Sequence, residues 1–168
     1  MRSTSPHSFR LLLRHADAGS RSAWVGDDQW RSLTELGQAQ ATEVAARSRD
    51  LPLLRIFSSP SLRCRQTVVP LARELSLDIE SCWQLGATVE LRHLLRFLGE
   101  DETESAVLCT HRETLQMLFA HLAEVEAARA DRVTPMSMAA AWILYGTVGR
   151  DAVQLECLPT LEVAASIG

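Results

Sequence analysis

The sequence predicts an α/β fold built around a largely parallel sheet. Three apolar runs have the length of short strands, and helical patterns lie between them. The runs show little alternation of apolar and polar residues, which is typical of strands that a parallel sheet buries on both faces. They are Leu11–Leu13, Leu54–Ser58 and Ser105–Thr110. Because open α/β sheets bind ligands beyond the carboxyl ends of their strands, the residues after each run are the first functional candidates.

Two cap patterns mark the starts of helices. Ser32 and Glu35 have the spacing of a capping box, with Thr34 as an alternative cap, and they predict a helix. Ser59 and Pro60 predict a second helix start, with the serine as the cap and the proline as the first helical residue. A helix N-terminus at the end of a strand is also a favourable place for an anion.

Pro70 lies inside this second helical stretch, which extends to Leu75. Proline removes a backbone donor and clashes with the preceding turn, so we expect a kink there or two short helices. Farther along, Glu90–Phe97 predicts an amphipathic helix, and a further helix is predicted after His111.

The remaining stretches predict strands and one long loop. Leu77–Cys82 alternates apolar and acidic residues and predicts an edge strand, while Ala139–Tyr145 and Ala152–Leu158 predict a closing pair of strands. Residues 16–31 are rich in Gly, Ser and Asp and contain two tryptophans. A loop of this length in a compact domain is typically functional or mobile.

The overall composition fits one globular domain over residues 1–168, with residues 1–8 as a loose N-terminus. A net charge of −4 argues against a nucleic-acid partner. No apolar segment is long enough to span a membrane, and the start lacks the apolar core of a signal peptide. We therefore expect a cytoplasmic protein with no membrane partner, and the oligomeric state stays open.

All 17 basic residues are arginines, and the chain contains neither lysine nor asparagine. The lack of lysine excludes Schiff-base chemistry and a P-loop. Arginine is thus the fixed cation for any anionic substrate, and its planar fork suits phosphate. The four cysteines show no CxxC pair and no zinc spacing, so we expect free thiols and no metal site.

Reactive side chains follow each of the three apolar runs. Arg14 and His15 follow the first run, Arg63 lies in the first turn after the second, and His111 follows the third. Arginines can neutralise phosphoryl oxygens in bidentate pairs, and a neutral imidazole can attack phosphorus to give a covalent intermediate. The set therefore predicts a site for phosphoryl chemistry that acts by positioning and charge stabilisation.

These residues stand in motifs that resemble those of the histidine phosphatase superfamily, which has the phosphoglycerate-mutase-like fold. Arg14-His15-Ala16 resembles the Arg-His-Gly signature, residues 58–67 resemble the Ser-Ser-x-x-x-Arg-Ala-x-Gln-Thr element, and Thr110-His111 matches the second histidine. Residues 31–41 are similar to the Arg-Pro-Leu-Thr-x-x-Gly-x-x-Gln-Ala stretch of the small SixA-like branch. Residues 19–28 look like the corresponding loop of the phosphatase domain fused to MutT-type nucleotide hydrolases.

The resemblance implies a three-layer α/β/α sandwich whose mixed sheet is mostly parallel, with one antiparallel strand. It implies that His15 is the nucleophile that becomes phosphohistidine, and that Arg14 and Arg63 hold the phosphoryl oxygens. It also implies that His111 completes the pocket and stabilises the charge of the transferring group. No metal or organic cofactor is implied.

Some positions depart from the pattern of the family or leave its roles open. Arg112 follows His111 and is either a third phosphate contact or a surface arginine of a first helical turn. The glutamate insertion that supplies the mutases with a general acid is not evident. Glu90 and Asp17 are the candidates for a proton donor, and the alternative for both is a solvated surface position.

The sequence thus predicts a phosphatase that hydrolyses phosphohistidine or a phosphomonoester through a covalent intermediate on His15. Its expected substrate is a phosphorylated protein or a small phosphoester. The alternatives among enzymes are a small-molecule or nucleotide phosphatase and a mutase-like phosphotransferase; the lack of lysine and asparagine counts against the mutase. The alternative of another class is a non-catalytic phosphate-binding interaction module.

Overall fold

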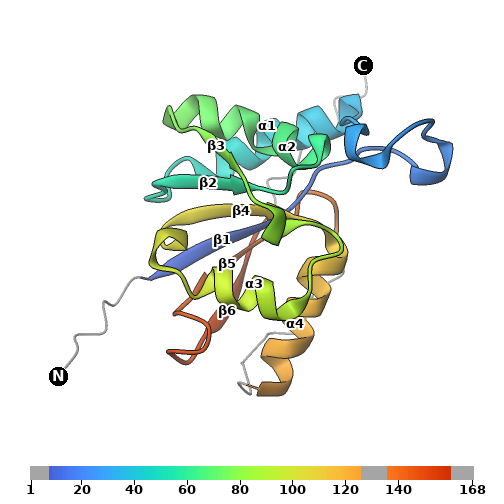
Figure 1. Cartoon of the computed structure of the whole chain (residues 1–168). Coiled ribbons are helices and arrows are strands. Elements are labelled where there is room, and N and C mark those ends of the chain that lie inside the picture. The colour runs from blue at the N-terminus through green and yellow to red at the C-terminus, as the bar shows by residue number, and fades with distance from the viewer. Residues whose placement is uncertain (1–7, 126–135, 160–168) are drawn as a thin grey trace.

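The computed structural model describes residues 8–125 and 136–159, and in these residues a single sheet is flanked by helices on both faces (Figure 1). The strands run in the spatial order β3-β2-β4-β1-β5-β6. Their bounds are β1 Phe9–Arg14, β2 Arg55–Ser58, β3 Ile79–Ser81, β4 Ala106–Thr110, β5 Ala141–Tyr145 and β6 Gln154–Leu158. The α-helices are α1 Glu35–Ser48, α2 Leu62–Leu75, α3 Leu91–Leu98 and α4 Arg112–Val125. Short 3₁₀ turns span Arg21–Ala23, Asp28–Trp30, Trp83–Leu85 and Asp101–Thr103.

The sheet is mixed, and within the described residues β5 is the strand that runs against the others. β1 pairs in parallel with β4, β4 with β2, and β2 with β3, whereas β5 is antiparallel to both β1 and β6. This confirms the predicted α/β fold with its mostly parallel sheet and single antiparallel strand. The predicted edge strand and the predicted closing pair of strands are also confirmed, as β3 and as β5 with β6.

Two apolar cores cover the two faces of the sheet. Leu11 and Leu13 of β1 pack in one cluster with Val44 of α1 and Val68 of α2, whereas Leu12 packs in the other cluster. The second cluster includes apolar residues of α3 and α4. Figure 1 shows the same arrangement, with α1 and α2 on one side of the sheet and α3 and α4 on the other. Burial on both faces explains why the β1 sequence shows no alternation of apolar and polar residues.

The first helix begins at the alternative cap rather than at the predicted capping box. Thr34 is the N-cap of α1, and its hydroxyl accepts a hydrogen bond of 3.1 Å from the backbone N–H of Gly37. The hydroxyl of Thr34 also donates to a carboxylate oxygen of Asp17 at 2.5 Å. The start of α1 is therefore tied to the chain that follows β1.

The predicted start of α2 is wrong by two residues. The helix begins at Leu62 with Ser61 as its N-cap, so Pro60 precedes the helix rather than opening it. The hydroxyl of Ser59 does not cap the helix; it contacts a ring nitrogen of His111 at 2.8 Å instead. Ser59, which the sequence pattern predicted as a helix cap, is therefore a hydrogen-bond partner of His111 instead.

Of the two alternatives predicted at Pro70, two short helices are wrong, because α2 is continuous from Leu62 to Leu75. The missing N–H of Pro70 removes one hydrogen bond of the helix. The residues on either side of it, Val68, Leu71 and Ala72, are buried in the core below α1 and α2. Burial of this apolar face stabilises the helix enough to retain the proline.

Several predictions concern the ends of the chain and the membrane. Ser8 is fixed to the sheet, because its carbonyl accepts a hydrogen bond from the N–H of Gly146 and its hydroxyl donates to Glu104. The rest of the expected loose N-terminus, residues 1–7, lies outside the described residues. Among the helices that the structure describes, none has the length and apolar character needed to cross a membrane.

Candidate active site

The strand register places the predicted site residues at one edge of the sheet. Arg14 is the partner of Thr110 across β1 and β4, and the backbone N–H of His15 donates to the carbonyl of Thr110 at 3.0 Å. The next residue after Thr110 is His111, so the two histidines leave adjacent strands at the same level. Their rings lie edge to face, with centroids 5.4 Å apart.

His15 is held in a single orientation by the backbone. Its Nδ1 lies 2.8 Å from the carbonyl oxygen of Ala16, and the side chain is 7% exposed. A carbonyl oxygen only accepts, so Nδ1 carries the proton and the lone pair of the neutral imidazole lies on Nε2. Burial lowers the pKa of His15; His111 and Arg63 lower it further, and Cys64 and the carbonyl of Ala16 oppose them. The ring is therefore neutral at pH 7, with an unprotonated Nε2.

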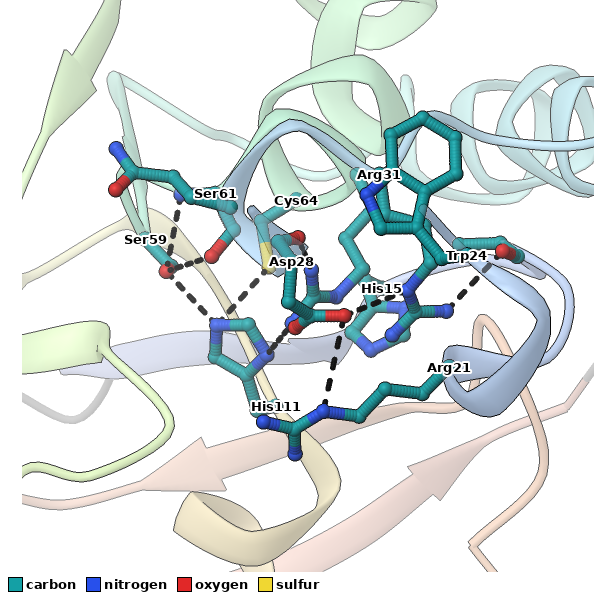
Figure 2. A network of polar contacts seen from close by, with 12 residues as sticks. His15, Arg21, Trp24, Asp28, Arg31, Ser59, Ser61, Cys64 and His111 are labelled. Carbon is teal, nitrogen blue, oxygen red and sulfur yellow. Dashed lines mark hydrogen bonds and ion pairs between the residues drawn. The ribbon is translucent and has the colours of Figure 1, made fainter. Parts of the chain in front are cut away.

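His111 is held in the opposite tautomer by two separate contacts. The hydroxyl of Ser59 lies 2.8 Å from Nε2, and a terminal nitrogen of Arg63 lies 3.4 Å from Nδ1. A guanidinium only donates, so Nδ1 of His111 accepts and Nε2 donates to Ser59. The thiol of Cys64 lies 3.6 Å from the same Nε2, and all of these side chains are buried (Figure 2).

The two predicted arginines are buried beside the histidines. Arg14 and Arg63 are 9% and 5% exposed, and their Nε atoms have no hydrogen-bond partner in the described part of the chain. A terminal nitrogen of Arg14 donates to the carbonyl of Met136. Burial lowers the pKa of Arg14, the charge of Arg112 lowers it further, and Glu113 raises it. An anion in contact with Arg14 would relieve this cost of burying the cation.

These side chains line one cavity of about 340 Å³. Its predicted members are Arg14, His15, Arg63, His111 and Arg112. The cavity is further lined by Gly19, Arg21, Asp28 and Arg31 from the loop after β1, by Ala87 and Thr88, and by Glu113 and Met138. The structure thus brings together residues from the ends of β1 and β4, the first turns of α2 and α4, and the 16–31 loop.

The two predicted proton donors lie outside this lining. Glu90 is the N-cap residue of α3, and its carboxylate is paired with Arg92 at 3.1 Å on the surface. Asp17 accepts a hydrogen bond from Thr34 at the start of α1. Both carboxylates have structural partners at these positions.

Sequence reasoning missed the two carboxylates that do line the cavity, Asp28 and Glu113. Asp28 accepts a hydrogen bond of 2.8 Å from Nε of Arg31 and is paired with Arg63 at 3.0 Å and with Arg21 at 3.8 Å (Figure 2). Burial raises the pKa of Asp28, but the hydrogen bond from Arg31 and the charges of the three arginines outweigh it, so the pKa lies below its usual value. Asp28 is therefore an anion inside the cavity.

No pattern in the sequence distinguished these two carboxylates. The 16–31 loop has no periodicity that would show which of its three aspartates turns inward. Glu113 is exposed on the first turn of α4, where a glutamate is common because it favours the helix dipole. The motif residue Arg31 was the one available signal, since its partner Asp28 lies three residues before it.

The sequence profile of the histidine phosphatase superfamily, branch 1, matches residues 11–86, which include most of β1, the loop, α1, β2 and α2. A curated relative, the 8-oxo-(d)GTP phosphatase of Mycolicibacterium smegmatis, is 28% identical over 141 residues. That match covers 80% of this chain and 43% of the relative, so the chain spans less than half the length of that protein.

Solved structures show the same fold. A SixA protein of Agrobacterium tumefaciens, assigned as a phosphohistidine phosphatase, superposes with a TM-score of 0.70 at 24% identity, covering 92% of this chain and 97% of that one. A mycobacterial glucosyl-3-phosphoglycerate phosphatase superposes with a TM-score of 0.65 at 19% identity, covering 89% and 97% of the two chains.

The profile match covers the strand, loop and helix that carry His15 and Arg63, and the structural matches cover the sheet that adds His111. Sequence profile, fold and site geometry agree. Over residues 11–86 the chain therefore matches branch 1 of the histidine phosphatase superfamily.

Proposed function

We propose that this chain is a phosphatase that hydrolyses phosphohistidine or a phosphomonoester through a covalent phosphohistidine on His15. The observation that carries the proposal is the tautomer of His15. Its Nδ1–H is bound to the carbonyl of Ala16, which leaves the lone pair of Nε2 for attack. The buried guanidinium groups of Arg14 and Arg63 supply positive charge in the same cavity.

The reaction has two steps. In the first, Nε2 of His15 attacks phosphorus, the bond between phosphorus and the leaving group breaks, and the leaving group departs with the electron pair and takes up a proton. In the second, water attacks phosphorus, the bond from phosphorus to Nε2 breaks, and inorganic phosphate leaves. Arg14 and Arg63 hold the oxygens that carry charge in both steps, with Arg112 as an outer contact. His111 completes the pocket and positions Arg63 through the contact of its Nδ1 with the guanidinium.

Glu113 is the candidate donor of the leaving-group proton in place of Glu90 and Asp17. It lines the cavity, and within the described residues its carboxylate has neither a hydrogen bond nor an ion pair, unlike Asp28. A proton donor matters when the leaving group is a poor one. Glu113→Gln should therefore lower kcat for an alkyl phosphate by roughly tenfold to a hundredfold and leave kcat for an aryl phosphate nearly unchanged. Equal loss on both substrates would contradict this role.

Two substrate classes fit the cavity. A phosphorylated protein fits because the lining is shared between exposed loops and helix starts, and a SixA protein from Agrobacterium tumefaciens, assigned to this class, has the same fold. A nucleotide is the second candidate, since Trp24 and Trp30 are 38% and 60% exposed on the loop that lines the cavity. Exposed indoles on this loop can stack on a base, and the curated relative is named for 8-oxo-(d)GTP.

The test is hydrolysis of an aryl phosphate by the wild type, by His15→Ala and by His121→Ala. His121 lies on α4 and does not line the cavity, so its removal is a matched control for loss of a histidine. The proposal predicts that His15→Ala is inactive and that His121→Ala keeps wild-type turnover. A wild type that binds orthovanadate without turning over any phosphoester would support the non-catalytic binding module instead. Release of phosphate from a phosphohistidine protein and from a nucleotide, measured in parallel, then separates the two substrate classes.

A further inference from the structure

The cavity of this protein already contains an anion of its own. Asp28 lies in the 3₁₀ turn Asp28–Trp30, and its carboxylate points toward Arg21 and Arg31 in the cluster that includes both histidines (Figure 2). The carboxylate lies 2.8 Å from Arg31, 3.0 Å from Arg63 and 3.8 Å from Arg21. The same three guanidinium groups could bind the oxygens of a phosphoryl group in place of the carboxylate.

Asp28 contacts both terminal nitrogens of Arg63. One donates to the backbone carbonyl of Asp28 at 2.8 Å, and the other, which also lies 3.4 Å from Nδ1 of His111, forms an ion pair of 3.0 Å with the carboxylate of Asp28. A phosphoryl group held in a bidentate pair on this side of the guanidinium uses the ion-paired terminal nitrogen together with Nε, which is buried and has no hydrogen-bond partner among the described residues. Arg63 therefore cannot offer this pair to the substrate until the carboxylate of Asp28 gives way.

The loop around Asp28 has anchors that do not depend on its carboxylate. Arg31 donates to the carbonyls of Ala18 and Gly19, and Asp27 caps the turn by accepting from the N–H of Gln29. The side chain of Asp28 is 26% exposed, so it can reach water when it leaves Arg63. Displacement of the carboxylate thus leaves the ends of the loop in place.

We propose that Asp28 is a built-in competitor for the phosphoryl group of the substrate, which binds by displacing its carboxylate from Arg63. The inference rests on the proposed function, because it names the group that sets the affinity of the same site. The site binds a phosphoryl group only in the fraction of molecules in which Asp28 has left Arg63. The apparent dissociation constant is the intrinsic one divided by that fraction.

The test measures binding of orthovanadate and of inorganic phosphate by calorimetry, so that it needs no substrate. Asp28→Asn keeps the shape of the side chain and removes the charge that holds it on the arginines. We expect it to bind both anions about five- to tenfold more tightly than the wild type. Asp28→Ser, a second neutral variant, should shift binding in the same direction, which makes the result independent of how one variant folds.

Asp27→Asn is the matched control. It removes the same charge from the same loop one residue away, and an asparagine oxygen can still accept from Gln29. We expect its dissociation constants to stay within about twofold of the wild type. An equal gain in Asp27→Asn would show a general effect of charge and overturn the competitor role of Asp28.

Kinetics separate competition from positioning. A competitor predicts that Asp28→Asn lowers KM and leaves kcat nearly unchanged. If Asp28 instead holds Arg63 in place for the substrate, Asp28→Asn will bind vanadate more weakly and raise KM, which would overturn the inference while the wild type still turns over. Failure of both the wild type and Asp28→Asn to bind vanadate would overturn the proposed function and this inference together.

Discussion

Ser59 offers the sharpest test of how the second histidine is positioned. Its hydroxyl accepts a hydrogen bond from the Nε2–H of His111 at 2.8 Å, and both side chains are almost completely buried. Ser59→Ala leaves that N–H without its acceptor, and the thiol of Cys64, 3.6 Å away, is a weak replacement. An unsatisfied buried donor costs about 1–3 kcal/mol, so the free energy of unfolding should fall by about 1–2 kcal/mol.

The same substitution should affect catalysis through the tautomer of His111. Without Ser59, the proton on Nε2 is free to move to Nδ1, the atom that Arg63 faces. We expect kcat/KM for an aryl phosphate to fall by roughly tenfold to a hundredfold. Nitrogen NMR of His111 should report an Nε2–H ring in the wild type and a mixture in Ser59→Ala.

Ser61→Ala is the control for this prediction. The hydroxyl of Ser61 lies 3.5 Å from that of Ser59, and in the described part of the chain it makes no hydrogen bond to His111. Its removal should change the free energy of unfolding by less than about 0.5 kcal/mol. If Ser59→Ala matched Ser61→Ala in unfolding, turnover and NMR signal, the hydrogen bond to His111 would have no role and the reasoning would be refuted.

Two further predictions concern pH and packing. Burial lowers the pKa of His15 below its ordinary value of 6.5. We therefore expect kcat/KM to stay level as the pH falls from 8 through 6.5 and to decline only below pH 6.5. A decline of kcat/KM with its midpoint above pH 6.5 would refute this prediction. The unfolded chain binds this proton more readily, so the wild type should lose stability below pH 6.5 more steeply than His15→Ala in urea unfolding. A Cβ at Gly37 would lie 2.0 Å from the backbone oxygen of Asp17, so Gly37→Ala should destabilise the fold by more than about 2 kcal/mol. Gly99→Ala, where the nearest contact is 3.4 Å, should be nearly neutral, and equal melting temperatures of the two variants would contradict the packing argument.

The sequence was sufficient to predict the sheet and the residues at its carboxyl edge. Leu11–Leu13 and the run that ends at Thr110 are apolar because both faces of their strands are buried. The residues that directly follow these buried strands lie at the carboxyl edge of the sheet, and this locates His15 and His111. Their adjacency then follows from the parallel register of β1 with β4.

The helix boundaries were less predictable because local patterns compete with tertiary contacts. Ser59 and Pro60 have the local pattern of a helix start, yet the hydroxyl of Ser59 serves His111 and the helix begins at Leu62. Pro70 has the local pattern of a break, yet the buried face of α2 outweighs the hydrogen bond that it removes.

The carboxylates of the site could not be predicted from sequence. Asp28 enters the cavity because three arginines from the loop and α2 converge on it, and that convergence exists only in the folded chain. Glu113 lines the cavity because α4 starts directly after β4. Neither carboxylate stands at a position that a periodicity or a motif spacing in the sequence would identify.

The covalent intermediate is the most direct test of the proposed function. The measurement is rapid acid-free quenching of the protein with a ³²P-labelled phosphoester, followed by location of the alkali-stable, acid-labile label in the chain. The geometry of Nε2 on His15 predicts label on His15 in the wild type and none in His15→Ala. Two results would contradict the proposed function. One is turnover by the wild type with no label on His15, and the other is turnover by His15→Ala at the rate of the wild type.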